Sequence, residues 1–372
     1  MRAIPKKMIL TAGPSRSPDD LVYVTDAVRH GWNFHHSDYI YKFEEAFAKY
    51  LGCNHALSVS AGTHALHLAL VLSGIGKGDE VLIPDLTYVA CSNVVHYTGA
   101  KPVFVEVDRR TWSIDVSKVE KYITKNTRVI MPVHLYGNVA DMEGIARIAK
   151  KHNLIIIEDA CEGLGCKLNN KMIGTLSDAA AFSFQGAKLL AIGEGGMLVT
   201  NRADWDTRAR SLADHGIDFN RQFWVKEIGY MYPMSNIQAA LGLARLEDIE
   251  NLISRKRKIF SWYKEGLKHT AGIELNPERA ELYSSYWMSS IILSPDLPIS
   301  RDELRKKLRA SNIDTRPFFF PISMFQLYDQ KKVSNPVAYE LASRGVNLPS
   351  GVMLEKSAVG YICQVIHRLL KT

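Results

Sequence analysis

The stretch AFSFQGAKLLAIGEGGMLVTN, residues 181–201, holds two short apolar runs separated by a lysine and a cluster of glycines. The runs, residues 179–184 and 196–200, have the length and composition of buried β-strands. Lys188 stands between them. A buried ammonium group is costly unless it is paired or used chemically, although most lysines avoid the cost by extending into solvent. The surroundings of Lys188 therefore decide whether it has a chemical role.

These two runs belong to a longer alternating pattern. Between residues 44 and 201, β-branched apolar runs alternate with segments of helical periodicity. Such continuous apolar runs, separated by amphipathic helices, are typical of a mostly parallel sheet that is covered on both faces. The pattern therefore predicts an α/β fold. The predicted strands are residues 56–60, 81–83, 102–107, 129–133, 154–157, 179–184 and 196–200.

The pattern of predicted helices and strands changes in the C-terminal third of the chain. A long helical pattern begins after Ser235, a candidate N-cap, and continues to about residue 268. It is followed by a strand at residues 289–293, a charged helix at 301–310 and a loop rich in Pro and Phe at 316–321. We therefore expect two domains, residues 1–245 and residues 246–372, of which the second is a smaller α+β domain.

The composition describes a globular chain of 372 residues with a net charge of +7. Its five cysteines form no CxxC pair and are odd in number, which favours a reducing, cytoplasmic setting. No window approaches the roughly 20 apolar residues that span a bilayer. We therefore expect a cytoplasmic protein with no membrane partner.

Two candidate ligand sites are weak. The basic run at residues 255–258 lies in a helical pattern with acidic neighbours, so it is interpreted as a solvated helix face and no nucleic-acid partner is expected. His30, His35 and His36 have no Cys or carboxylate at ligand spacing, so no metal site is expected.

Chemically active residues follow several predicted strands. Asp159 follows the run at 154–157, Tyr88 follows the run at 81–83, and Lys188 follows the run at 179–184. The turn SAGTHA at residues 60–65 opens a helix, and free backbone N–H groups at a helix start suit a phosphate. In open α/β sheets, ligands bind at the carboxyl ends of the strands. A lysine, an aspartate, an aromatic ring and a phosphate turn are together the parts of a pyridoxal phosphate site.

The chain resembles the DegT/DnrJ/EryC1/StrS family of sugar aminotransferases in seven motifs that cover almost its whole length. The motifs are SAGTHALHLAL, DLTYVACSN, PVHLYGNVADM, IIEDACEGLG, FSFQGAKLLAIGEGGMLVTN, SNIQAALGLARLE and NIDTRPFF. The resemblance implies the aspartate-aminotransferase fold, with a mostly parallel seven-stranded sheet and a smaller C-terminal α+β domain. It also implies pyridoxal 5'-phosphate as cofactor, with pyridoxamine phosphate as its second form, and a homodimer.

The resemblance also implies roles for individual residues. Lys188 would bind the cofactor covalently and move the proton, Asp159 would pair with the pyridine nitrogen, and Glu162 would lie near the ring hydroxyl. Tyr88 would stack on the ring. Arg316 would face the nucleotide sugar. The phosphate would be held by Gly62, Thr63 and Ser183, with His64 in the same turn where the family often has alanine.

One departure from the family concerns the dimer. The family places the cofactor at a subunit interface, where an asparagine from the loop before the long helix reaches the partner's phosphate. This chain has Met231 at that position, and Asn236 is the candidate replacement. We therefore expect composite active sites, built with the loop at residues 229–236 and its exposed aromatic and methionine side chains.

The implied reaction moves an amino group from an amino acid, expected to be glutamate, to a nucleotide-linked keto-sugar. The runs NIDTRPFFFP and VNLPSG resemble the perosamine-synthase-like branch, which aminates carbon 4 of 4-keto-6-deoxy sugars. Amination at carbon 3 stays open. Two rivals are a sugar dehydratase of the same fold, which would carry histidine in place of Lys188, and a binding protein that has lost activity.

Overall fold

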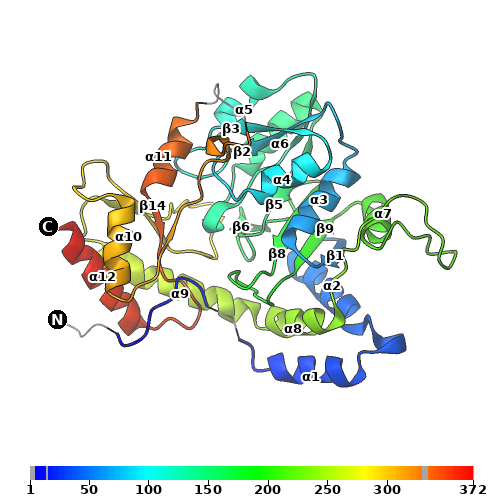
Figure 1. Cartoon of the computed structure of the whole chain (residues 1–372), viewed down its shortest axis with the longest axis horizontal. Coiled ribbons are helices and arrows are strands. Elements are labelled where there is room, and N and C mark those ends of the chain that lie inside the picture. The colour runs from blue at the N-terminus through cyan, green and yellow to red at the C-terminus, as the bar shows by residue number, and fades with distance from the viewer. Residues whose placement is uncertain (1–4, 14–15, 329–333, 372) are drawn as a thin grey trace.

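A seven-stranded sheet forms the centre of the larger part of the molecule (Figure 1). The computed structural model describes residues 5–13, 16–328 and 334–371. The strand order is β1-β9-β8-β5-β4-β2-β3. All neighbouring strands are parallel except β9, which is antiparallel to both β1 and β8. The prediction of a mostly parallel seven-stranded sheet is confirmed. Its strands are β1 (His55–Val59), β2 (Glu80–Pro84), β3 (Lys101–Val105), β4 (Thr127–Ile130), β5 (Ile155–Asp159), β8 (Ala179–Ser183) and β9 (Gly196–Thr200).

Helices bury both faces of this sheet. Along β2, Leu82 belongs to one hydrophobic cluster, whereas its neighbours Val81 and Ile83 belong to the other. Both faces of the strand are therefore apolar, as expected for a buried parallel strand. Helices α2, α6 and α8 pack in the first cluster, and α3, α4 and α7 in the second. The helices of this part are α1 (Asp20–His30), α2 (Asp38–Leu51), α3 (Gly62–Leu72), α4 (Ala90–Tyr97), α5 (Val116–Tyr122), α6 (Met142–His152), α7 (Ala203–Ala213) and α8 (Asn236–Glu247).

A smaller antiparallel sheet, in the order β10-β12-β14-β13, lies beside the C-terminal helices. The predicted strand at 289–293 and helix at 301–310 are both present. Ile9 pairs with Ile313, so the described N-terminal residues pack against this C-terminal part (Figure 1). The division of the chain at residue 245 stays a prediction. The elements here are α9 (Ile249–Leu267), β10 (Ile273–Leu275), β12 (Ser290–Leu293), α10 (Arg301–Ala310), β13 (Arg316–Pro317), α11 (Pro336–Arg344), β14 (Gly345–Asn347) and α12 (Lys356–Leu370).

A third, three-stranded sheet joins segments from both parts of the chain. Strand β11 pairs with β6, which in turn pairs with β7. These strands are β6 (Lys167–Leu168), β7 (Lys171–Met172) and β11 (Leu282–Tyr283), and the short 3-10 helices are Asn33–His35, Leu135–Gly137 and Ile322–Met324.

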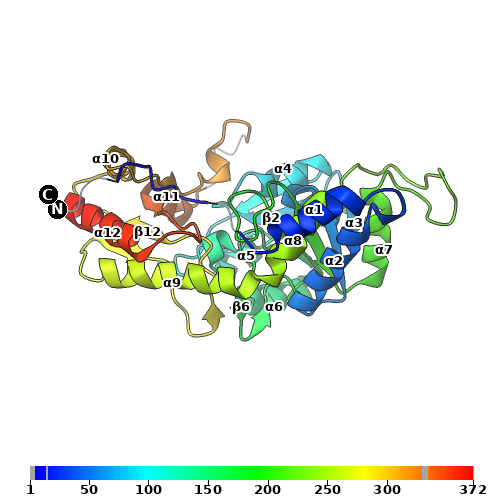
Figure 2. The ribbon, with the colours of Figure 1, turned by 90° about the horizontal axis from the view of Figure 1, so that it is seen from below.

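The long helix predicted from residue 235 to 268 is divided in two. Ser235 caps α8, since its side chain accepts a hydrogen bond from the backbone N–H of Gln238, and the Gln238 side chain accepts one from the backbone N–H of Ser235. The helix ends at Glu247, and α9 begins after Asp248. Helix α9 then runs from the large sheet to the smaller part (Figure 2). The break lets one hydrophobic pattern serve two differently directed helices.

The interpretation of residues 255–258 as a solvated helix face is wrong for three of the four side chains. Arg255 donates to the carbonyls of Val352 and Leu354, and Arg257 donates to that of Ser284. Lys256 is only 5% exposed. These carbonyls come from segments far along the chain, so the helical pattern alone could not reveal them.

Lys256 is a buried ammonium group held by backbone carbonyls. Its Nζ donates to the carbonyl oxygens of Trp287 and Ser350, each at 2.6 Å. Burial lowers the pKa of Lys256 from 10.5 to about 7. The residue therefore ties α9 to the segments before β12 and after β14.

We expect Lys256 to make the stability of the fold depend on pH. Between pH 7 and 10.5 the unfolded chain binds a proton that folded Lys256 has lost, so the free energy of unfolding should rise with pH. Lys256→Met lacks this group. In denaturant unfolding, the free energy of unfolding of the wild type should rise relative to that of the variant by up to about 1.4 kcal/mol per pH unit in this range. A difference between the two proteins that is constant with pH would contradict this account.

Candidate active site

A cavity of about 460 Å³ lies at the carboxyl ends of the central strands. It gathers groups from the turns after β1, β2, β5 and β8 and from the smaller part of the chain. This is the edge at which open α/β sheets bind ligands. The predicted site residues that line it are Gly62, Thr63, Tyr88, Asp159, Glu162, Ser183, Lys188 and Arg316.

Lys188 lies in this cavity with two partners for its charge. Its Nζ is 3.1 Å from Oε1 of Glu162 and 4.1 Å from the centre of the Trp287 ring. The Lys188 side chain is 16% exposed, so its amine is largely shielded and still faces the cavity. A carboxylate and an aromatic face both attract a cation. The cost of burying this lysine is therefore offset by its neighbours.

Glu162 is held at both oxygens. Oε1 accepts from Lys188, and Oε2 accepts from the backbone N–H of Tyr136 at 2.8 Å. Burial raises the pKa of Glu162, and the charge of Lys188 opposes that rise. The pair thus depends on both partners, because either charge alone would be buried without compensation.

Trp287 is a site residue that the sequence did not reveal. Its ring covers Nζ of Lys188, and its Nε1 donates to the carbonyl of Ala187 at 2.8 Å. It arrives from the segment before β12, far from the lysine in the sequence. No spacing or motif marks this tryptophan, since only the packing of the two parts brings it to the cavity.

Asp159 is the last residue of β5 and is 6% exposed. Its Oδ1 accepts from the backbone N–H of Cys161, and its Oδ2 accepts from the thiol of Cys91, both at 3.0 Å. A carboxylate has about four acceptor sites, so two hydrogen bonds leave capacity for a ligand. Asp159 can therefore accept a hydrogen bond from a protonated ring nitrogen in the cavity.

The start of α3 supplies a site for an anion. Gly62 begins this helix after Ala61, which has no side-chain oxygen to cap the first backbone N–H groups. Thr63 and Ser183 add hydroxyl groups beside it. A Cβ at Gly62 would lie 2.8 Å from that of Ser183, so the close packing requires glycine. The uncapped helix start and hydroxyls suit a phosphate.

His64 does not line this cavity. Its ring stacks on Tyr232 at 3.9 Å, and its Nδ1 is 2.9 Å from the hydroxyl of Ser60. Burial lowers the pKa of His64. The His64 side chain thus joins the start of α3 to the loop before α8.

Asn236 is also outside the cavity, because it binds its own chain. It is 8% exposed, and its Oδ1 accepts from the backbone N–H of Tyr39 at 2.9 Å. The predicted exposure of the loop at 229–236 is correct for Met231, which is 67% exposed, but not for Met234, which is buried. Tyr232 is half-buried, since it stacks on His64.

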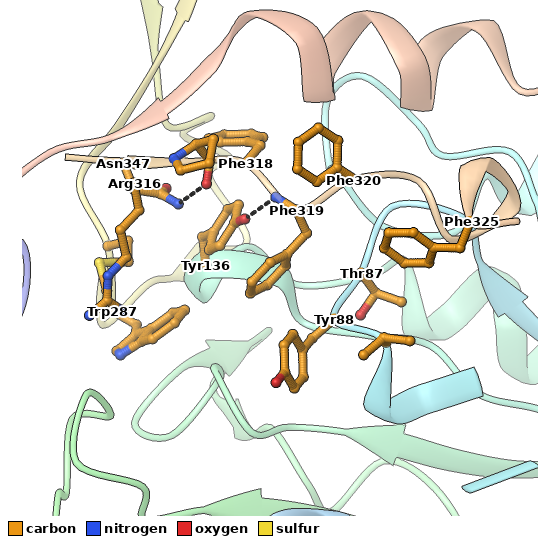
Figure 3. Close-up of a pocket in the computed structure, with 13 residues that line it drawn as sticks. Thr87, Tyr88, Tyr136, Trp287, Arg316, Phe318, Phe319, Phe320, Phe325 and Asn347 are labelled. Carbon is orange, nitrogen blue, oxygen red and sulfur yellow. Dashed lines mark hydrogen bonds between the residues drawn. The ribbon is translucent and has the colours of Figure 1, made fainter. Parts of the chain in front are cut away.

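A second cavity of about 320 Å³ opens beside the first, and Figure 3 shows its aromatic walls. Tyr88 is 57% exposed here, and its ring lies 5.4 Å from that of Phe319. Phe319 donates its backbone N–H to the Tyr136 hydroxyl at 2.9 Å. The residues shared by both cavities are Thr87, Tyr88, Trp287, Arg316 and Phe319.

Arg316 extends beside Trp287 where the two cavities meet (Figure 3). Its side chain is exposed, and within the described part of the chain its guanidinium forms no ion pair. A guanidinium that is free and faces a cavity can bind a carboxylate or a phosphate of a ligand.

The first cavity fits pyridoxal phosphate. Lys188 would hold the cofactor's aldehyde carbon, Asp159 its ring nitrogen, and the start of α3 its phosphate, while the exposed face of Tyr88 would stack on the ring. When bound, the cofactor supplies an electron sink for charge that develops on the substrate carbon. The amine of Lys188 is then the group placed to move a proton.

Two other classes of feature are missing from residues 5–13, 16–328 and 334–371. No group of three His, Cys, Asp or Glu side chains there could hold a metal ion. No helix in the same ranges is long and apolar enough to cross a membrane.

Comparison with known proteins agrees with this geometry. The DegT/DnrJ/EryC1/StrS aminotransferase family matches residues 14–367. The chain is 42% identical to GDP-perosamine synthase of Escherichia coli O157:H7, covering 97% of this chain and 98% of the relative. It is 35% identical to UDP-N-acetyl-3-dehydro-α-D-glucosamine 3-aminotransferase of Acidithiobacillus ferrooxidans, covering 86% and 85%.

A solved structure, that of DesV from S. venezuelae, superposes with a TM-score of 0.88 at 31% identity, covering 95% of each chain. Its match extends over the central sheet and the smaller part alike. The chain therefore belongs to the DegT/DnrJ/EryC1/StrS aminotransferase family, and it is a pyridoxal-phosphate-dependent aminotransferase of nucleotide sugars.

Proposed function

We propose that the enzyme aminates carbon 4 of a GDP-linked 4-keto-6-deoxy sugar, with glutamate as the amino donor. The observation that carries the proposal is the aromatic cavity that opens beside Lys188. Its walls are mostly aromatic: the Tyr136 hydroxyl bonds Phe319 and the Asn347 amide bonds Pro317, while the free guanidinium of Arg316 lies where this cavity meets the first one. Such a wall offers little to a hydroxyl group but suits the methyl group of a 6-deoxy sugar.

The similarity to GDP-perosamine synthase supports this choice over amination at carbon 3. The relative that aminates carbon 3 is less similar, 35% against 42% identical, and matches less of this chain. Carbon-3 amination is therefore the second candidate.

In the proposed reaction, the chain's own groups bind the two substrates in turn and move protons. Lys188 removes the proton from the α-carbon of glutamate; the amino group would be held by the bound cofactor, and water supplies the keto oxygen of the 2-oxoglutarate that leaves. The amino group then replaces the keto oxygen at carbon 4 of the sugar, which departs as water, and Lys188 returns a proton to carbon 4. Arg316 binds a negatively charged group of the nucleotide sugar at the mouth of the cavity.

We also propose that the enzyme is a homodimer with composite active sites. An arm at residues 217–228 projects from the end of α7, and Ile217 pairs with Val225 across it (Figure 1). Phe223 and Ile228 on this arm are 94% and 91% exposed. Exposed apolar side chains of this size are costly in water and are typical of an interface between subunits.

A panel of GDP-, dTDP- and UDP-linked keto-sugars with glutamate tests the proposed substrate. We expect the GDP-linked 4-keto-6-deoxy sugar to have the highest kcat/KM, by at least about tenfold, which corresponds to about 1.4 kcal/mol of transition-state binding. The position of the new amino group is read from the product by nuclear magnetic resonance. A 3-amino product, or a preference for a 6-hydroxylated sugar, would overturn the proposal.

Substitution of Lys188 and Asp159 tests the roles assigned to them. Lys188→Ala should fold with the wild-type circular dichroism spectrum and lose at least about 1,000-fold in kcat, because it lacks the base. Asp159→Asn should lose about 100-fold, because an amide cannot stabilise a protonated ring nitrogen. If the Lys188→Ala variant catalysed transamination near the wild-type rate, Lys188 could not be the base that moves the proton.

Sedimentation at micromolar concentration tests the dimer. The double variant Phe223→Glu, Ile228→Glu should sediment as a monomer with little activity, because charges would be placed in the interface. Leu10→Glu is the matched control, since Leu10 is also exposed but belongs to the N-terminal segment beside the smaller part. It should sediment as the wild type does. A wild-type monomer with full activity would rule out composite sites.

A further inference from the structure

The thiol of Cys91 forms an unusual contact within the active site. It lies 3.0 Å from Oδ2 of Asp159, the carboxylate that faces the cofactor cavity. Cys91 is the second residue of α4 and is completely buried. The other oxygen of Asp159 accepts from the backbone N–H of Cys161. The carboxylate is thus held by one backbone group and one side chain.

The surroundings keep this thiol in its protonated, donating form. Burial and the charge of Asp159 raise the pKa of Cys91 well above its ordinary value. The hydroxyl of Thr87 lies 3.5 Å from Sγ on another side. Since Asp159 is an acceptor, the hydrogen bond runs from the thiol to the carboxylate.

The same short segment of chain serves two parts of the site. Tyr88, whose ring is exposed in the cavity, lies three residues before Cys91 in the turn between β2 and α4. The hydrogen bond between Cys91 and Asp159 therefore ties the end of β5 to the turn that carries Tyr88. These are the two groups that would hold the nitrogen and the face of one ring.

We infer that Cys91 is a positioning residue, whose thiol fixes the carboxylate of Asp159 at the angle at which it binds the ring nitrogen of pyridoxal phosphate. A supporting hydrogen bond limits the rotation of a side chain that must meet its ligand in one geometry. A thiol is a weak donor, so it orients the carboxylate while withdrawing little of its negative charge. This role goes beyond the proposed sugar specificity and is independent of the sugar used.

Cofactor affinity gives the first test. Cofactor-free protein is titrated with pyridoxal phosphate, and the dissociation constant is read from the absorbance of the bound form. Cys91→Ala removes the donor, and we expect its dissociation constant to rise at least about tenfold. Cys91→Ser keeps a donor and should stay within about threefold of the wild type. Cys363→Ser, which changes a buried thiol in the core of the smaller part, is the matched control.

Infrared spectroscopy gives a second readout that needs no substrate or catalysis. The S–H stretching band of Cys91 is isolated by subtracting the spectrum of Cys91→Ser from that of the wild type. In Asp159→Asn this band should move to higher frequency, because an amide oxygen is a weaker acceptor than a carboxylate, while the band of Cys363 stays in place. Melting curves exclude unfolding as the cause.

Two results would overturn the inference. One is a Cys91→Ala variant that folds and binds pyridoxal phosphate as tightly as the wild type. The other is a Cys91 band that does not move when Asp159 is replaced, which would show that the thiol does not bond the carboxylate.

Discussion

The ion pair between Lys188 and Glu162 is the interaction on which the site depends. Both groups are largely buried, and an unpaired charge there would cost several kcal/mol. Glu162 follows β5 and Lys188 follows β8, and these strands are parallel neighbours in the sheet. Because these two strands end at the same edge of the sheet, the residues that follow them can place opposite charges in one cavity. The strand order of the sheet therefore determines whether this pair can form.

A second buried network supports the same strand from its other face. Glu158 precedes Asp159 and accepts from His134 Nε2 and from the backbone N–H groups of Gly174 and Leu176. Burial alone would raise the pKa of Glu158, but these hydrogen bonds hold it below its ordinary value. The backbone N–H of His134 also donates to the carbonyl of Asp159. Asp159 therefore faces the cavity, and its neighbour Glu158 stabilises β5 from the opposite face of the sheet.

Local patterns in the sequence predicted the strands of the central sheet and the residues that follow them. The apolar runs gave all seven strands of the central sheet because a buried parallel strand must be apolar on both faces. Lys188 and Asp159 could be identified because each follows such a run. The start of α3 was visible as a turn of small residues.

The parts that escaped prediction depend on contacts between distant segments. Trp287 reaches Lys188 only through the packing of the smaller part on the larger one, and Lys256 holds the carbonyl of that tryptophan. Asn236, the candidate for a contact with a partner's phosphate, accepts a hydrogen bond from the backbone N–H of Tyr39 at the start of α2, which the sequence did not reveal. In each of these contacts the two residues are far apart in the sequence, so periodicity and motif spacing could not predict that they meet.

The central claim is that Lys188 is the residue that binds pyridoxal phosphate. Borohydride reduction of the protein loaded with this cofactor, followed by mass spectrometry of its peptides, tests the claim directly. The account predicts one phosphopyridoxyl group, attached to the peptide that contains Lys188. A reduced protein with the group on another lysine, or with no attached group at all, would contradict it.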